Sequence, residues 1–183
     1  MGLTNSSTGI HSVSTDLRIT KKHPGDISVA LAGNPNVGKS TIFNKLTGMH
    51  QHTGNWPGKT VTNAIGTCKS SSGTFIFADI PGTYSLIPHS SEEETARDFI
   101  CFGGPDVVVL VCDACTLERN LNLVLQTLEI NPHSVVCVNL MDEAEKKGIE
   151  IDLSLLSQKL GVPVVATAAR TGRGINKLLK SIE

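Results

Sequence analysis

The sequence predicts an α/β fold in which a mostly parallel central sheet carries helices on both faces. From residue 27 onward, short apolar runs alternate with segments of helical periodicity, a pattern typical of such folds. The first apolar run leads into a glycine-rich loop of the phosphate-binding type. Further polar motifs follow later runs, at the strand ends where parallel sheets bind their ligands.

The chain has 183 residues, enough for one domain with a core of its own. We expect this domain over residues 27–183, after a flexible polar extension over residues 1–26. The formal net charge of −1 argues against a nucleic-acid partner, because nucleic-acid-binding domains usually carry a basic face. No apolar run approaches the roughly 20 residues of a membrane-spanning helix, and we see no secretory signal. The five cysteines are an odd number and lie mostly in apolar runs, so we expect reduced, buried thiols and a location in the cytosol.

In the first half of the domain, the run 27–32 predicts a buried parallel strand. The next segment predicts a helix whose apolar positions share one face and which Gly48 ends. A strand pair over 61–68 and 74–78 follows, joined by a turn rich in serine and glycine. A capping box that begins at Ser91 then opens a second helix.

In the second half, the run 106–111 predicts another buried strand, and a long amphipathic helix follows it. The run 135–138 predicts the next strand. Asp152 can cap a helix that Gly161 ends. A last strand over 164–166 and a final amphipathic helix complete the alternation.

The loop from Gly33 to Ser40 fits the pattern G-x-x-x-x-G-K-[ST] of P-loop nucleotidases. Its glycines let the backbone fold around a chain of phosphates, and Lys39 can reach the outer phosphates. The Ser40 hydroxyl can ligate Mg²⁺, and the positive end of the following helix favours the same anion. The predicted strand before the loop and helix after it are the context that this motif requires. The chain is therefore expected to bind a nucleoside triphosphate.

Two further segments are candidates for contacts with Mg²⁺ and the γ-phosphate. Asp79 ends a predicted strand and can hold Mg²⁺ through water, while the Gly82 N–H can contact the phosphate. Thr60 lies in a loop rich in glycine and proline, where a threonine can bind Mg²⁺ and order the loop around a triphosphate. A plain strand-to-turn connection and an ordinary surface loop are the alternative interpretations.

The segment 139–142 fits N-x-x-D, the guanine-reading element of GTPases. The Asp142 carboxylate can accept hydrogen bonds from both adjacent donors of guanine, whereas adenine presents an unprotonated N1 there. Charge-assisted hydrogen bonds of roughly 1.5–3 kcal/mol each imply on the order of a hundredfold preference for guanine or more. Leu140 would give the flat face of the base an apolar contact. After the last strand, N–H groups of the segment 167–169 can bond the guanine carbonyl.

Together these motifs resemble the small GTPases of the translation-factor-like (TrmE-Era-like) class. More narrowly, the chain resembles the N-terminal G domain of the bacterial ferrous iron transport protein B family, over essentially all of residues 27–183. The segments that carry this resemblance are 33–41, 54–58, 79–86, 117–121 and 139–146. It implies the P-loop fold of a small GTPase G domain.

The resemblance also implies a GTPase on the cytoplasmic face of the bacterial inner membrane. Its partners would be GTP or GDP and the membrane permease region of the same or an associated polypeptide that carries Fe²⁺, with a homo-oligomer as a possible assembly. It further implies hydrolysis stimulated by K⁺, with Asn36 and backbone carbonyls near Gly54 and Trp56 coordinating that ion beside the phosphates.

Thr83 follows Gly82 at the place where Ras-like GTPases carry the glutamine that orients the attacking water. We therefore predict slow intrinsic hydrolysis, on the order of 10⁻⁴ to 10⁻³ per second. Two alternative functions are an RNA-linked GTPase of ribosome assembly or tRNA modification and a nucleotide-binding switch that does not hydrolyse.

The expected site divides into three sets of residues. The nucleotide-binding set is Gly33, Asn34, Pro35, Asn36, Val37, Gly38, Lys39, Ser40, Thr41, Gly58, Lys59, Thr60, Asp79, Ile80, Pro81, Gly82, Asn139, Leu140, Met141, Asp142, Thr167, Ala168 and Ala169. The catalytic set is Lys39, Asn36 and Thr60. The metal set is Ser40, Thr60 and Asp79 for Mg²⁺, and Asn36, Gly54 and Trp56 for K⁺.

Overall fold

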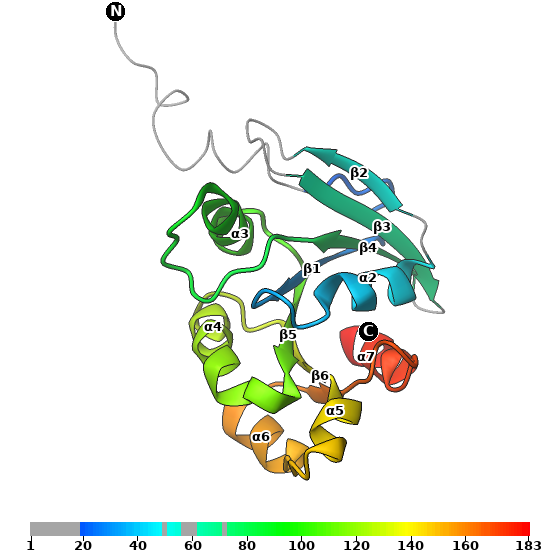
Figure 1. Ribbon diagram of the computed structural model, residues 1–183. Coiled ribbons are helices and arrows are strands. Elements are labelled where there is room, and N and C mark those ends of the chain that lie inside the picture. Colours follow the sequence, from blue (N-terminus) through cyan, green and yellow to red (C-terminus); the bar gives the residue numbers. More distant parts are fainter. Residues whose placement is uncertain (1–18, 49–50, 56–61, 71–72) are drawn as a thin grey trace, which may run out of the picture.

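The computed structural model describes residues 19–48, 51–55, 62–70 and 73–183, and for 51–55, 62 and 63 it describes the backbone alone. Strands and helices alternate along the chain (Figure 1). The strands are β1 (Ile27–Gly33), β2 (Gln51–Asn55), β3 (Thr62–Ser70), β4 (Gly73–Asp79), β5 (Val107–Asp113), β6 (Ser134–Asn139) and β7 (Val164–Ala166). The helices are α2 (Lys39–Thr47), α3 (Ser91–Phe102), the short 3₁₀ turn η1 (Ala114–Thr116), α4 (Leu117–Ile130), α5 (Met141–Lys146), α6 (Leu153–Leu160) and α7 (Ile175–Ile182).

The seven strands form one sheet in the order β2-β3-β4-β1-β5-β6-β7. The pairs from β4 to β7 are parallel, whereas β3 runs antiparallel to both of its neighbours. Helices cover both faces of this sheet, as Figure 1 shows. The mostly parallel α/β fold that the sequence predicts is confirmed.

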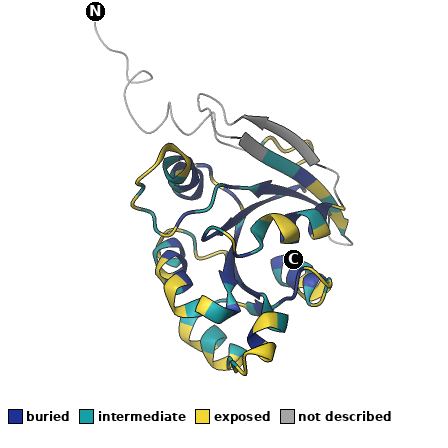
Figure 2. Ribbon diagram, in the orientation of Figure 1, coloured by how far each residue is buried: buried dark blue, intermediate teal, exposed yellow. Residues whose placement is uncertain are grey.

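Alternating side chains of the central strands build a core on each face of the sheet. On β1, Ala30 and Ala32 belong to the core under α3 and α4, while Val29 and Leu31 belong to the core under α2 and α7. All four are fully buried. Figure 2 shows the same division, with a buried sheet between helices whose outer faces are exposed. The apolar runs of the sequence are therefore continuous because both faces of these strands are covered.

The structure corrects three details of the predicted elements. Helix α3 is capped by Ser90, whose Oγ accepts a hydrogen bond from the Glu93 N–H at 3.2 Å, and not by Ser91. Strand β2 was not predicted, because its polar sequence with one glycine has low strand propensity. Helix α5 was not predicted either, because six residues are too few to display helical periodicity.

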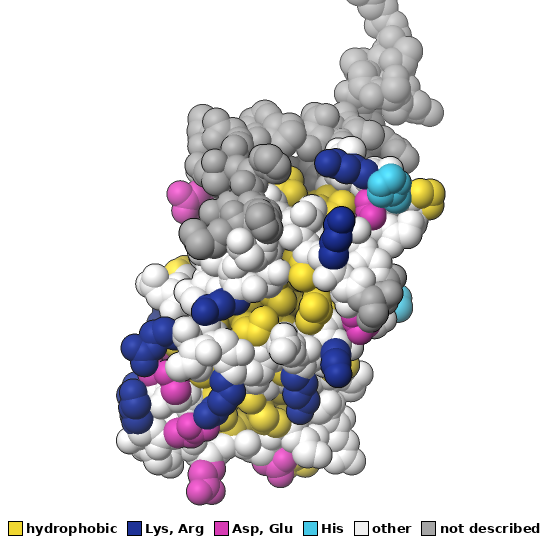
Figure 3. Space-filling view, turned by 90° about the vertical axis from the view of Figure 1, so that its right-hand side faces the viewer, with side chains coloured by type: hydrophobic (Ala, Val, Ile, Leu, Met, Phe, Trp, Pro, Cys, Tyr) yellow, Lys and Arg dark blue, Asp and Glu magenta, His cyan; other side chains and the backbone are white. Residues whose placement is uncertain are grey.

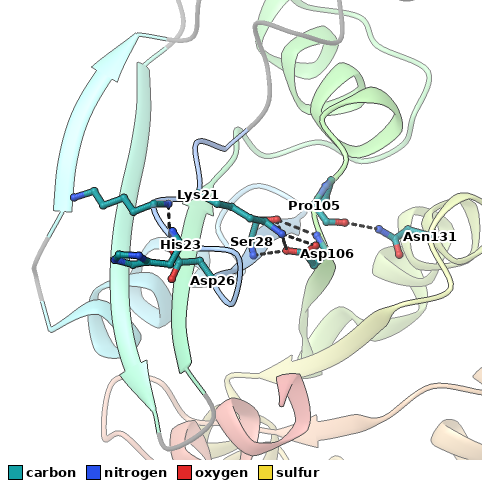
Figure 4. Close-up of polar contacts among 8 residues, drawn as sticks. Lys21, His23, Asp26, Ser28, Pro105, Asp106 and Asn131 are labelled. Atoms are coloured by element: carbon teal, nitrogen blue, oxygen red, sulfur yellow. Dashed lines mark hydrogen bonds and ion pairs between the residues drawn. The ribbon is translucent and has the colours of Figure 1, made fainter.

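Residues 19–26, which fall in the expected extension, contact the domain at the amino ends of β1 and β5. Ile19 packs against the core under α3 and α4, and Lys21 forms an ion pair with Asp106 at 2.6 Å. Figure 4 shows Asp106 at the centre of this group, where Ser28 also donates to its carboxylate through both N–H and Oγ. Residues 1–18 lie outside the described residues. The boundary at residue 26 stays a prediction.

None of the helices in the described part of the chain is long and apolar enough to cross a membrane.

Candidate functional site

The phosphate-binding motif forms the connection between β1 and α2. Two of its glycines lie where any side chain would collide. A Cβ at Gly33 would be 2.4 Å from the Val111 carbonyl oxygen, and a Cβ at Gly38 would be 2.4 Å from Nδ2 of Asn139. Gly38 also has a positive φ of 85°, which glycine adopts without strain. The two motif glycines thus let the loop pass between strand ends and turn into α2.

A pocket of about 460 Å³ opens at the start of α2. It is lined by Asn34, Pro35, Asn36, Gly38, Lys39, Ser40, Thr41, Gly82 and Glu92. Eight of these nine residues belong to the predicted nucleotide-binding set, so the structure brings the loop and the end of β4 to one cavity. Val37 instead packs into the core, and its carbonyl accepts a hydrogen bond from Nδ2 of Asn139. The first turn of α2 adds its unpaired N–H groups to this pocket.

Asp79, at the end of β4, bonds to the first two residues of α2. One carboxylate oxygen lies 2.8 Å from Nζ of Lys39, and the other accepts a hydrogen bond of 2.6 Å from Oγ of Ser40. The Lys39 and Asp79 side chains are only 12% and 11% exposed. Three predicted residues therefore form one compact polar group, in which Lys39 and Asp79 are largely desolvated and Ser40 is exposed.

The segment after Asp79 packs tightly against the phosphate-binding loop. Ile80 is buried in the core, and a Cβ at Gly82 would be 3.0 Å from the backbone of Pro35. Thr83 is completely buried, its N–H donates to the Gly33 carbonyl at 3.1 Å, and its Oγ1 donates to the Ser85 carbonyl at 2.6 Å. The Thr83 hydroxyl is thus engaged within its own loop.

Asn139, at the end of β6, connects three of the predicted loops. Its Nδ2 donates to the Val37 carbonyl at 2.9 Å, and its Oδ1 accepts from Oγ1 of Thr167 and the N–H of Ala169, both at 3.0 Å. The side chain is fully buried. Asn139 therefore fixes the phosphate-binding loop relative to the segment after β7, and the sequence alone did not predict this role.

Asp142 lies in the first turn of α5, one turn beyond Asn139. Its side chain is 20% exposed, and its carboxylate lies 3.4 Å from a guanidinium nitrogen of Arg170. Leu140 precedes α5 with a left-handed φ of 63°, and Met141 is the first residue of that helix. The carboxylate and the half-buried Leu140 thus lie on one short connection at the carboxyl end of the sheet.

The N–H groups expected to meet the guanine carbonyl already have acceptors in the protein. The N–H of Thr167 donates to the Val138 carbonyl at 2.8 Å, and the N–H of Ala168 donates to the Arg173 carbonyl at 3.0 Å. The Ala169 N–H donates to Asn139, as described above. Recognition of a base by Ala169 would therefore require a shared hydrogen bond.

The K⁺ and Thr60 predictions fall largely outside the described residues. Trp56, Gly58, Lys59 and Thr60 are not described. Gly54 lies in β2, opposite Asn63 of β3. Asn36 is exposed, with a left-handed φ of 65°.

One residue of the pocket and one partner of Asp142 were missed by the sequence reasoning. Glu92, from the first turn of α3, lines the phosphate pocket. Arg170, whose side chain is 75% exposed, pairs with Asp142. A basic residue directly after the segment 167–169 is the only sequence signal that could have indicated it.

Chemically, the site offers convergent N–H donors and a lysine for phosphates at one end, and a carboxylate for a base with two adjacent donors at the other. A family model described as ferrous iron transport protein B matches residues 27–182. The chain belongs to this family. The match spans the whole sheet and every loop of the site.

Curated relatives carry the same family name. The fusion protein of Fe(2+) transport protein A and Fe(2+) transporter FeoB from Porphyromonas gingivalis is 45% identical over 157 residues, which cover 85% of this chain and 19% of that protein. The Fe(2+) transporter FeoB of Salmonella typhimurium is 43% identical over 161 residues, which cover 86% of this chain and 21% of that protein. The chain thus spans about a fifth of the length of these relatives.

Solved structures agree with the family assignment. The G domain of the T. maritima FeoB iron transporter is 42% identical and superposes with a TM-score of 0.81, covering 86% of this chain and 96% of that one. The cytosolic domain of the same transporter in its GMPPNP form is 43% identical with a TM-score of 0.82, covering 85% of this chain and 62% of that one. The G domain of FeoB from Methanococcus jannaschii is 44% identical with a TM-score of 0.76, covering 86% and 95%. These similarities confirm the predicted G-domain fold.

Proposed function

We propose that this chain is the guanine-nucleotide-binding and hydrolysing domain of a ferrous iron membrane transporter, acting on the cytoplasmic side of the membrane. The observation that carries the proposal is the contact of Asn139 with Val37 and Ala169, because it joins the phosphate-binding loop to the base-reading loops. Nucleotide-bound forms of the T. maritima relative, with GDP and with GMPPNP, support the same ligand class.

In this proposal the phosphates lie against the loop 34–38 and the first turn of α2. Lys39 neutralises the outer phosphates, and backbone N–H groups hold the inner ones. The base lies between Leu140 and the carboxylate of Asp142, which accepts two hydrogen bonds from guanine. The contact between Arg170 and the Asp142 carboxylate must break when the base binds, and the Arg170 guanidinium can then stack on the ring.

The residues present fit a Mg²⁺ ion. Oγ of Ser40 and the Asp79 carboxylate are hard oxygen donors only 2.6 Å apart, and Mg²⁺ in nucleotide sites is held by one or two such groups together with phosphates and water. Bound Mg²⁺ would neutralise charge that develops on the phosphates. Thr60 stays a candidate ligand outside the described residues.

A K⁺ ion beside the phosphates is the second proposed cofactor. Amide and carbonyl oxygens suit such a monovalent cation, and the exposed Asn36 lines the phosphate pocket. Gly54 and Trp56 stay the candidate carbonyl donors. Because the Thr83 hydroxyl is buried and bonded to Ser85, it is not free to orient a water, which supports slow hydrolysis that a cation accelerates.

The test of this function is GTP turnover in KCl and in NaCl at equal ionic strength. We expect turnover on the order of 10⁻⁴ to 10⁻³ per second in NaCl and a clear rise in KCl. The Asn36→Ala variant should keep the NaCl rate and lose the rise, whereas Asn176→Ala, an exposed asparagine on α7, should behave as the wild type. Equal rates in the two salts would remove the K⁺ part of the proposal.

A further inference from the structure

Asp79 is bonded to both side chains that a nucleotide and its divalent cation would need. Its two carboxylate oxygens meet Nζ of Lys39 at 2.8 Å and Oγ of Ser40 at 2.6 Å. Both charged side chains are almost withdrawn from water, at 12% and 11% exposure. Water therefore competes only weakly with the Lys39–Asp79 ion pair, whereas the Ser40 end of the contact is exposed.

The contact follows from the arrangement of the sheet. Strands β1 and β4 are parallel neighbours, with Leu31 opposite Asp79. The loop after β1 turns back at once, so α2 begins beside the end of β4. As the first two residues of α2, Lys39 and Ser40 reach the two oxygens of one carboxylate.

We propose that Asp79 is an internal substitute for phosphate, which occupies Lys39 and Ser40 in the nucleotide-free protein and opposes nucleotide binding until a divalent cation engages its carboxylate. The inference rests on the proposed function, because it concerns the same phosphate site. It adds a built-in requirement for a divalent cation at the binding step, separate from hydrolysis.

The charges explain why the contact would oppose binding. Lys39 carries one positive charge, which the carboxylate of Asp79 already compensates. A phosphate that enters alone must either displace Asp79, which leaves a desolvated carboxylate unpaired, or lie next to it as a like charge. When Asp79 and Ser40 turn instead to a divalent cation, Lys39 becomes free for the phosphate. Binding of cation and nucleotide is therefore positively coupled.

The test is equilibrium binding of a fluorescent GDP analogue, once with EDTA and once with Mg²⁺. In EDTA, Asp79→Asn should bind the analogue about tenfold more tightly than the wild type, because the competing charge is gone. With Mg²⁺, the wild type should gain far more affinity than the variant does. Ser40→Ala removes one of the two contacts and should bind about twofold to threefold more tightly in EDTA.

Glu92→Gln is the matched control. It removes a carboxylate that lines the same pocket, yet Glu92 is exposed, so its charge is screened and the affinity in EDTA should change less than about twofold. An equal gain for Glu92→Gln and Asp79→Asn would overturn the inference, since any lost charge would then suffice.

The remaining outcomes separate the inference from the proposed function. If the wild type binds the analogue and Asp79→Asn binds it no more tightly in EDTA, the inference alone is overturned. If circular dichroism shows that Asp79→Asn is unfolded, an unchanged affinity of Ser40→Ala in EDTA overturns it. Absence of binding by the wild type with or without Mg²⁺ overturns the proposed function and the inference together.

Discussion

Single residues at strand ends connect the loops of this site. The fully buried Asn139 side chain makes three hydrogen bonds. One is to a carbonyl of the phosphate-binding loop, and the other two are to a hydroxyl and an N–H of the segment after β7. A buried amide whose oxygen and nitrogen are both bonded holds one geometry, because a shifted loop would leave polar groups unpaired. Asn139 therefore sets the distance between the phosphate-binding loop and the segment after β7.

At the same scale, Asp142→Asn tests base recognition. The amide offers a donor where guanine also has donors, so we expect GTP affinity to fall about tenfold to a hundredfold while the affinity for a xanthine nucleotide rises. Competition binding against a fluorescent GDP analogue measures both. Glu145→Gln, which also loses a carboxylate of α5 but pairs with Arg173, is the control. GTP affinity that matched the wild type in the Asp142 variant would contradict the base assignment.

Among the elements, α4 holds the loop that follows Gly82. Oε1 of Gln126 accepts a hydrogen bond from the Leu86 N–H at 2.7 Å, and Nδ2 of Asn122 donates to the Tyr84 carbonyl at 3.3 Å. The Arg119 guanidinium lies over the Tyr84 ring, 4.3 Å from its centroid. A helix anchored in the core thus fixes a loop whose start contacts the phosphate site, so movement of that loop must break contacts with α4.

Gln126→Ala tests this support at the element scale. The Leu86 N–H loses its acceptor, and we expect its hydrogen exchange to become about tenfold faster at unchanged global stability. Hydrogen exchange followed by NMR measures the single amide. Gln158→Ala, an exposed glutamine on α6, should leave the rate as it is. Equal protection of Leu86 in both variants would mean that α4 does not restrain the loop.

At the scale of the whole molecule, the polar group around Asp106 ties the segment 19–26 to the sheet, at the end opposite the phosphate-binding loop (Figure 4). Burial alone would raise the pKa of Asp106, but hydrogen bonds from Lys21 and Ser28 outweigh it and hold the pKa below its ordinary value of 3.8. A depressed carboxyl pKa stabilises the fold above the unfolded-state pKa, and this stability is lost as the pH falls through the folded-state value.

The predicted consequence is a pH-dependent gap between the free energies of unfolding of the wild type and Asp106→Asn. At pH 7 the variant should be less stable, by no more than about 1 kcal/mol because the pair is partly exposed. Below the ordinary carboxyl pKa of 3.8 the gap should shrink, since the wild-type carboxylate becomes protonated. Urea unfolding over a pH series measures it. A gap of constant size across the series would show that the charge of Asp106 contributes nothing.

The surface adds a further whole-molecule feature. On the face drawn in Figure 3, acidic side chains lie among the basic ones, and hydrophobic side chains are visible between them. This mixture differs from the continuous basic stripe that is typical of nucleic-acid-binding domains, on the face that the view covers.

Most of the fold could be predicted because buried parallel strands such as β1 and β5 are continuous apolar runs. Helices such as α6 also have capping residues in the sequence, and the Asp152 carboxylate accepts a hydrogen bond from the Leu155 N–H at 2.9 Å. Strand β2 could not be predicted, because it forms through its pairing with β3 and its composition does not favour a strand. In the site, motif spacing predicted the phosphate-binding loop. The contacts of Asp79 and Arg170 depend on tertiary packing between distant segments, which no spacing rule contains.

The central claim is that this domain hydrolyses a guanine nucleotide. Phosphate release from GTP and from ATP, in Mg²⁺ and KCl, tests it most directly, with Lys39→Ala as the inactive reference. We predict slow release from GTP, at least a hundredfold slower release from ATP, and none above background for Lys39→Ala. Equal release from the two nucleotides, or no release from GTP by the wild type, would contradict the account.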